Sequence, residues 1–154
     1  AERREIRSPV GLAQPKDRTL AYADVKSAKA EENVLRLLFT DQKLIHGVEE
    51  QLPAAWFSAP VLRKIYERVL ELDRSGSLVD ALAFEGQLET NEMSLLAGIL
   101  EQGVPPGDHR AELREYINTI RLQRVKDGTL TQAGEDPLLT FGRMKNQNAG
   151  GQTI

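Results

Sequence analysis

The 154-residue sequence contains no cysteine and only two histidines, His46 and His109. Without cysteine, the chain has no disulfide, no thiol nucleophile, no iron–sulfur cluster and no cysteine-based zinc site. Because the two histidines are far apart in the sequence, a metal site would have to consist almost entirely of carboxylates. The composition therefore excludes most metal and redox chemistry, and it fits a reducing, cytoplasmic location.

Long apolar runs are missing as well. No run approaches the roughly 18 residues that a membrane-spanning helix needs, and the N-terminal AERREIRSPVG has no apolar core of the kind found in a signal peptide. Hydrophobic residues make up 40% of the chain and charged residues 28%, which is typical of a globular domain with a buried core. We therefore expect no contact with a membrane.

The common catalytic motifs are also absent. The sequence has no GxxxxGK[ST] or GxGxxG phosphate-binding loop, no HExxH and no DxD. Adjacent carboxylates such as Glu31 and Glu32 do not share a helix face, and they are typical of an acidic helix surface. Ser27 and Ser58 fit helix N-cap positions, and no serine has a nearby histidine to activate it. We predict that the chain is not an enzyme and has no catalytic residue, no metal and no cofactor.

Charge is present but unevenly distributed. The net charge is −3, yet residues 1–30 carry seven Lys/Arg against four Asp/Glu. Residues 31–108 carry six against fourteen, and residues 109–154 carry seven against five. A basic beginning, a strongly acidic middle and a mildly basic end indicate separate parts of the chain, and they argue against a nucleic-acid-binding core.

The pattern of apolar residues predicts an all-α fold, because strand signals are poor and apolar residues recur at helical spacing. Residues 1–26 combine Pro9, Gly11 and Pro15 with many charges, which predicts a flexible linker from a preceding domain. Residues 27–106 predict a bundle of about five to six helices. Residues 108–146 predict a long helix followed by a C-terminal helical hairpin, and residues 147–154 predict a disordered tail.

Capping residues mark the expected helix starts in the bundle. We expect Ser27, Asp41, Ser58 and Asp80 to cap the first four helices, and Thr90 or Asn91 to cap the fifth. The apolar stripes of the first three are Ala30, Val34, Leu35 and Leu38; Leu44, Ile45, Val48 and Leu52; and Val61, Leu62, Ile65, Tyr66, Val69, Leu70 and Leu72. The fifth is expected to bury Leu95, Leu96, Ile99 and Leu100.

The last predicted helix runs from a cap at Asp108 to about Lys126, and its apolar face changes along its length. Its main stripe is Leu113, Tyr116, Ile117 and Ile120. At 100° per residue, Leu122 and Val125 lie about 180° and about 120° away from Leu113. The second half of this helix is therefore predicted to leave the bundle and pack elsewhere.

The order of these segments resembles the C-terminal, helicase-binding domain of bacterial DNA primase over roughly residues 27–126. The stretches that carry the resemblance are SAKAEENVLRLLFTDQKLI, WFSAPVLRKIYERVLEL, LLAGILEQG and REYINTIRLQRVK. The N-terminal domain of the replicative helicase is similar in fold. Three features favour primase: the charged linker before Ser27, the arginine-bearing long helix, and the end of the chain soon after the hairpin.

The resemblance implies a non-catalytic docking module of a DNA primase, a nucleotidyltransferase whose zinc-binding and polymerase domains would lie outside this chain. The module would bind the N-terminal ring of the hexameric replicative helicase and couple primer synthesis to unwinding at the fork. Single-strand-binding protein is a second candidate partner. We expect the chain alone to be monomeric, with weak or absent DNA contact.

Displaced apolar groups beside arginines are typical of protein interfaces, and they define the helicase-binding residues that we expect. These are Arg121, Leu122, Arg124, Val125, Leu138, Leu139, Phe141 and Met144. An almost equally strong alternative is that the eight residues hold the two arms of the hairpin together. Two other functions stay open: an oligomer-forming collar domain of the replicative helicase itself, and a small helical nucleic-acid-binding domain.

Overall fold

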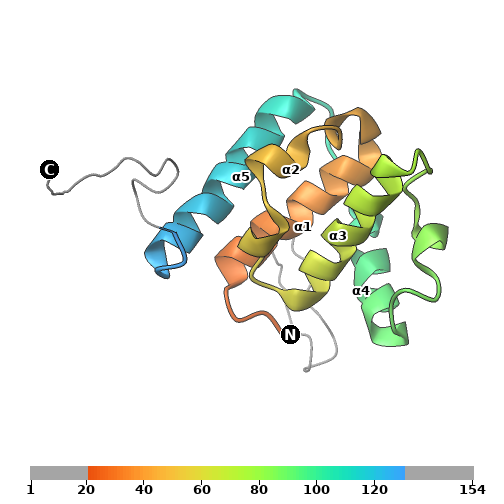
Figure 1. The fold of residues 1–154 in the computed structure, drawn as a ribbon, viewed down its shortest axis with the longest axis horizontal. Helices are drawn as coiled ribbons and strands as arrows, with labels where there is room; N and C mark the ends of the chain where they lie inside the picture. The colour runs from red at the N-terminus through yellow and green to blue at the C-terminus, as the bar shows by residue number, and fades with distance from the viewer. Residues whose placement is uncertain (1–20, 131–154) are drawn as a thin grey trace, which may run out of the picture. The chain divides into compact units, whose positions relative to one another are not determined.

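The computed structural model describes residues 21–130. The α-helices in this range are α1 (Val25–Thr40), α2 (Val48–Gln51), α3 (Pro60–Arg74), α4 (Thr90–Glu101) and α5 (His109–Lys126). Three 3-10 helices join them: η2 (Gln42–Leu44), η3 (Ala54–Trp56) and η4 (Ala81–Phe84). Residues 21–130 contain no strand beyond one isolated bridge between Glu85 and Leu88. The predicted all-α bundle is confirmed (Figure 1).

Most of the predicted linker, the returning arm of the predicted hairpin and the predicted tail at 147–154 lie outside the described residues. The chain divides into two units, residues 1–120 and residues 121–154, and the division falls within α5.

Helix α1 is the central element of the first unit. It packs against α3 and α4, and Figure 1 shows α1 and α3 running side by side. Val34, Leu35 and Leu38 are completely buried, and so are residues on the other faces of the helix, including two glutamates. A helix that is buried all round forms the middle of a bundle.

The first helix begins earlier than predicted. Asp24 is its N-cap, because the Asp24 carboxylate accepts a hydrogen bond from the backbone N–H of Ser27 at 3.0 Å. Ser27 itself is buried in the first turn, where its hydroxyl donates to Glu31 Oε2 at 2.6 Å. The prediction of a cap at Ser27 was wrong because aspartate caps a helix as well as serine does, and Asp24 stands at the true boundary.

The second predicted helix is interrupted. Leu44, Ile45, Val48 and Leu52 are all buried, as the stripe predicted. However, Gly47 has a φ of +80°, which ends the 3-10 helix η2 and its following turn before α2 begins. A left-handed residue cannot continue an α-helix, so the single predicted helix becomes two short ones.

Helix α3 has the apolar stripe that the sequence predicted, from Val61 to Leu72. Its start differs, because Ala59 is the N-cap and offers no capping side chain. Tyr66 stacks on Phe57 with ring centroids 4.5 Å apart, and its hydroxyl donates to the carbonyl of Leu52 at 2.7 Å. The connection before α3 is thus fixed from inside the bundle.

Helix α4 begins with a reciprocal capping box rather than with Thr90 or Asn91 as cap. Glu89 and Glu92 each accept a hydrogen bond from the other's backbone N–H. Leu95, Leu96 and Ile99 are buried as predicted, whereas Leu100 is only half-buried.

Candidate protein-binding surface

The first half of α5 belongs to the bundle. Asp108 caps the helix as predicted, because its carboxylate accepts from the N–H of Ala111 at 3.1 Å. Leu113, Ile117 and Ile120 are buried and are part of the hydrophobic core. The stripe read from the sequence therefore anchors this half of the helix.

The second half of α5 carries four of the eight residues predicted to contact a partner. Leu122 is 46% exposed, so its side chain does not follow the buried stripe. Arg121 and Val125 are half-buried. Whether these side chains contact a partner stays a prediction.

Arg124 differs from the other three because it is only 3% exposed. Its Nε donates to Asp127 Oδ2 at 2.9 Å. Thr129 donates to the same carboxylate from its side chain and its backbone, and together with Arg124 it holds the pKa of Asp127 below its ordinary value. Arg124 thus has a partner at the end of its own helix, where Gly128 adopts a left-handed conformation with a φ of +87°.

The other four predicted residues, Leu138, Leu139, Phe141 and Met144, lie outside the described residues. The alternative that the eight residues hold the two arms of the predicted hairpin together likewise stays a prediction.

The structure reveals a buried carboxylate that the sequence reasoning missed. Glu31 is fully buried in α1. Its carboxylate accepts hydrogen bonds from Ser58 Oγ at 2.7 Å, from the N–H of Ser58 at 3.0 Å and from the N–H of Ala59 at 3.2 Å. Glu31 therefore provides the capping acceptor that α3 lacks in its own sequence. Its negative charge is also stabilising at the N-terminus of α3, which is the positive end of the helix dipole.

A second buried network begins at the neighbouring residue. Glu32 is fully buried, accepts a hydrogen bond from the hydroxyl of Tyr22, and lies 3.8 Å from the guanidinium of Arg36. Arg36 Nε donates to the carbonyl of Ile99 at 2.8 Å and so ties α1 to α4.

Burial dominates the electrostatics of this network. It raises the pKa of the Tyr22 phenol, and the negative charge of Glu32 raises it further, so Tyr22 stays a hydrogen-bond donor. Burial also lowers the pKa of Arg36, whereas the negative charge of Glu32 acts to raise it.

The prediction of an acidic helix surface at Glu31 and Glu32 was wrong. The usable signal was the i,i+4 spacing of Ser27 with Glu31 and of Glu32 with Arg36, which pairs each glutamate with a hydrogen-bond donor along the helix.

Metal-binding clusters and membrane-spanning helices are absent among the described residues. Among residues 21–130, no three or more His, Asp or Glu side chains gather where they could hold a metal ion. Within the same range, no helix is both long and apolar enough to span a membrane. The buried carboxylate of Glu31 accepts from backbone donors, and that of Glu32 lies against fixed side chains of the bundle.

Comparison with families of known domains gives one match. Residues 23–121 match the family described as "DnaB-like helicase N terminal domain". The matched range begins two residues before α1 and ends just after the last core residue of α5, so it includes the whole bundle. No curated protein and no solved structure matches the chain.

This match overturns the assignment to a primase docking module, and with it the nucleotidyltransferase parent. The resemblance rested on the leucine-rich helices of the bundle, which the two kinds of domain share. The linker and the chain end, which favoured primase, lie outside the matched residues. Of the hypotheses left open by the sequence, the helicase collar domain fits the match.

Proposed function

This chain belongs to the family of DnaB-like helicase N-terminal domains, and from that premise we propose that it is the collar domain of a replicative helicase. In this role it joins copies of the helicase into a ring during DNA replication. The observation that carries the proposal is the family match over residues 23–121. The domain itself has no catalytic task, because unwinding belongs to the helicase as a whole, and it works in the cytoplasm.

The second half of α5 is the proposed contact between copies. Leu122 is a large apolar side chain with 46% of its surface exposed, next to the half-buried Arg121 and Val125. Apolar anchors flanked by arginine are enriched in protein interfaces. The remaining predicted residues, at 138–144, are proposed to extend this contact. Primase is the further partner that the family suggests.

Light scattering coupled to size-exclusion chromatography tests the collar assignment. We expect the purified chain to form a dimer or larger assembly whose mean mass rises across the micromolar range. A chain that stays monomeric throughout that range would contradict the proposal.

The contact itself is tested by Leu122→Glu. A buried glutamate in an apolar contact has a high desolvation cost, so we expect the variant to weaken self-association by about tenfold or more. The matched control is Leu82→Glu in η4, where the leucine is 72% exposed. If the control weakens association and Leu122→Glu does not, the contact lies elsewhere on the bundle.

A further inference from the structure

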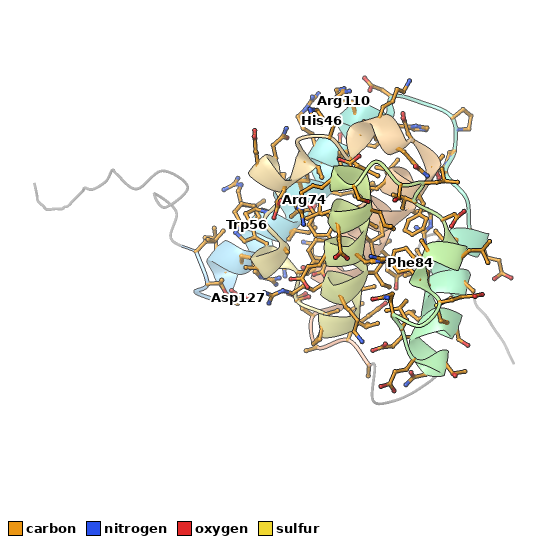
Figure 2. The ribbon with its side chains drawn as sticks, turned by 45° about the vertical axis from the view of Figure 1, so that its right-hand side comes forward. His46, Trp56, Arg74, Phe84, Arg110 and Asp127 are labelled. Carbon is orange, nitrogen blue, oxygen red and sulfur yellow. The ribbon has the colours of Figure 1, made fainter. Side chains whose placement is uncertain are left out.

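A small pocket opens between α5 and the segment that joins α1 to α2. It has a volume of about 80 Å³. Leu44, Val48 and Leu113 provide its apolar part, and its polar part comes from His46, Gln51, Arg110 and Arg114. Figure 2 shows His46 and Arg110 near each other at one end of the bundle. His46 lies directly before Gly47, whose φ of +80° marks the turn between η2 and α2.

The two arginines of this pocket differ from the other surface arginines of the bundle. Both are exposed, and neither has a carboxylate within 4.0 Å among residues 21–130. The other surface arginines of the bundle are paired, Arg63 with Glu67, Arg68 with Glu71 and Arg74 with Glu49, whereas lysines such as Lys26 and Lys43 have no ion pair among residues 21–130. These two guanidinium groups lie one helical turn apart on α5, so a single acidic segment can reach both.

We propose that this pocket is a docking site for an acidic, partly aliphatic peptide segment of another protein. Carboxylates of that segment accept hydrogen bonds from Arg110 and Arg114, whose planar guanidinium groups match carboxylate geometry. An adjacent aliphatic side chain fills the space over Leu44, Val48 and Leu113. The His46 ring adds one donor in either of its neutral tautomers.

Charge and shape favour a protein segment over nucleic acid. Binding to a phosphate backbone needs many cations, whereas the lining of this pocket has two arginines. The pocket lining includes no aromatic side chain on which a base would stack. At this pocket a short acidic segment is favoured over a second copy of this chain, because a copy would bring the negative charge of a whole acidic bundle against this one. The inference needs only these charges and this pocket, and it does not depend on the collar assignment.

A fluorescence polarisation titration of the full chain tests the site. The probe is a short labelled peptide of Asp-Asp-Leu repeats, compared with one of Asp-Asp-Ser repeats and one of Lys-Lys-Leu repeats. We expect the first peptide to bind most tightly and the third not to bind. The variant Arg110→Glu/Arg114→Glu should weaken binding of the first peptide by about tenfold or more, because it replaces two charged donors by repulsive groups.

The matched control is Lys26→Glu/Lys43→Glu, which makes the same change in net charge at two exposed lysines outside the pocket lining. We expect this control to weaken binding by no more than about threefold. Equal losses in both double variants, equal binding of the Ser peptide, or no binding of the first peptide would each overturn the proposal. It would also be overturned if the arginine variant abolished binding of single-stranded DNA, or self-association, while peptide binding stayed unchanged.

Discussion

At the scale of single residues, the buried carboxylate of Glu31 connects two helices through several hydrogen bonds. Its one carboxylate receives donors from α1 and from the start of α3, more than twenty residues away in the sequence. Because it is fully buried, none of these hydrogen bonds is replaced by water when one partner is lost. Glu31 therefore fixes how the first turn of α3 meets the central helix.

We predict that Glu31→Gln lowers the free energy of unfolding by about 2 to 3 kcal/mol, since it removes the charge from several hydrogen bonds and turns an amide donor toward backbone donors. Urea denaturation followed by circular dichroism measures the change. The control is Glu50→Gln on α2, an exposed glutamate, for which we expect a change within about 0.5 kcal/mol. Equal changes in the two variants would show that Glu31 does not cap α3.

Glu92 gives the bundle a dependence on acid pH. Burial acts to raise the pKa of its carboxyl group, but hydrogen bonds from Lys64 at 2.8 and 2.9 Å and from the N–H of Glu89 outweigh burial and leave that pKa below the ordinary 4.5. A carboxyl group with a lowered folded-state pKa stabilises the fold above its ordinary pKa. This contribution is lost as the pH falls through the folded-state value.

We predict that the stability difference between the wild type and Glu92→Gln is largest near neutral pH and shrinks as the pH falls below 4.5. Denaturation curves at a series of pH values provide the measurement. In a Lys64→Gln background the same difference should depend less on pH. A difference that is constant with pH in both backgrounds would contradict the assigned role of Lys64.

At the scale of elements, the apolar stripes were predictable, and so were the caps at Asp80 and Asp108, whereas the starts of α1, α3 and α4 were not. The stripes of α1, α3 and α5 follow from periodicity within one segment, which decides the buried face locally. A helix start needs only one acceptor for its free N–H groups, and that acceptor need not be local. Asp24 and Glu89 provide it from nearby, whereas Glu31 provides it from another helix.

Gly47 decides whether the segment after α1 is one helix or two. We predict that Gly47→Ala destabilises the fold by about 1 to 2 kcal/mol, because an L-residue is strained in the left-handed region. No atom lies within 4 Å of the added Cβ, so the cost arises from the backbone alone. Gly47→Asn should cost less, since asparagine tolerates this region better. Thermal and urea denaturation would measure both, and equal costs for Ala and Asn would point to a cause other than backbone strain.

At the scale of the whole molecule, the acidic segment of the chain lies inside the range that matches the family. The acidic residues 31–108 fall within the matched range 23–121, and that range ends where the second unit begins at Arg121. The proposed contact between copies lies beyond this acidic core. Copies that approach through it must still overcome repulsion between their acidic bundles.

We therefore predict that self-association becomes tighter as salt is raised, because the screening length falls from about 10 Å at 0.1 M to about 3 Å at 1 M. Binding of the acidic peptide to Arg110 and Arg114 should become weaker over the same series. Sedimentation velocity measures the first effect and fluorescence polarisation the second. If both respond to salt in the same direction, one of the two surfaces has been assigned the wrong partner.

The sequence by itself determined the helical class, most of the buried faces and the change of face along α5, because each depends on spacing within a single segment. It did not separate the collar domain from the primase domain, because their core patterns are similar. The tertiary structure decided the burial of Glu31 and Glu32 and the pocket beside Arg110. These features join side chains that are distant in the sequence. The spacing of apolar residues within one segment cannot predict which distant donor or cavity a side chain will contact.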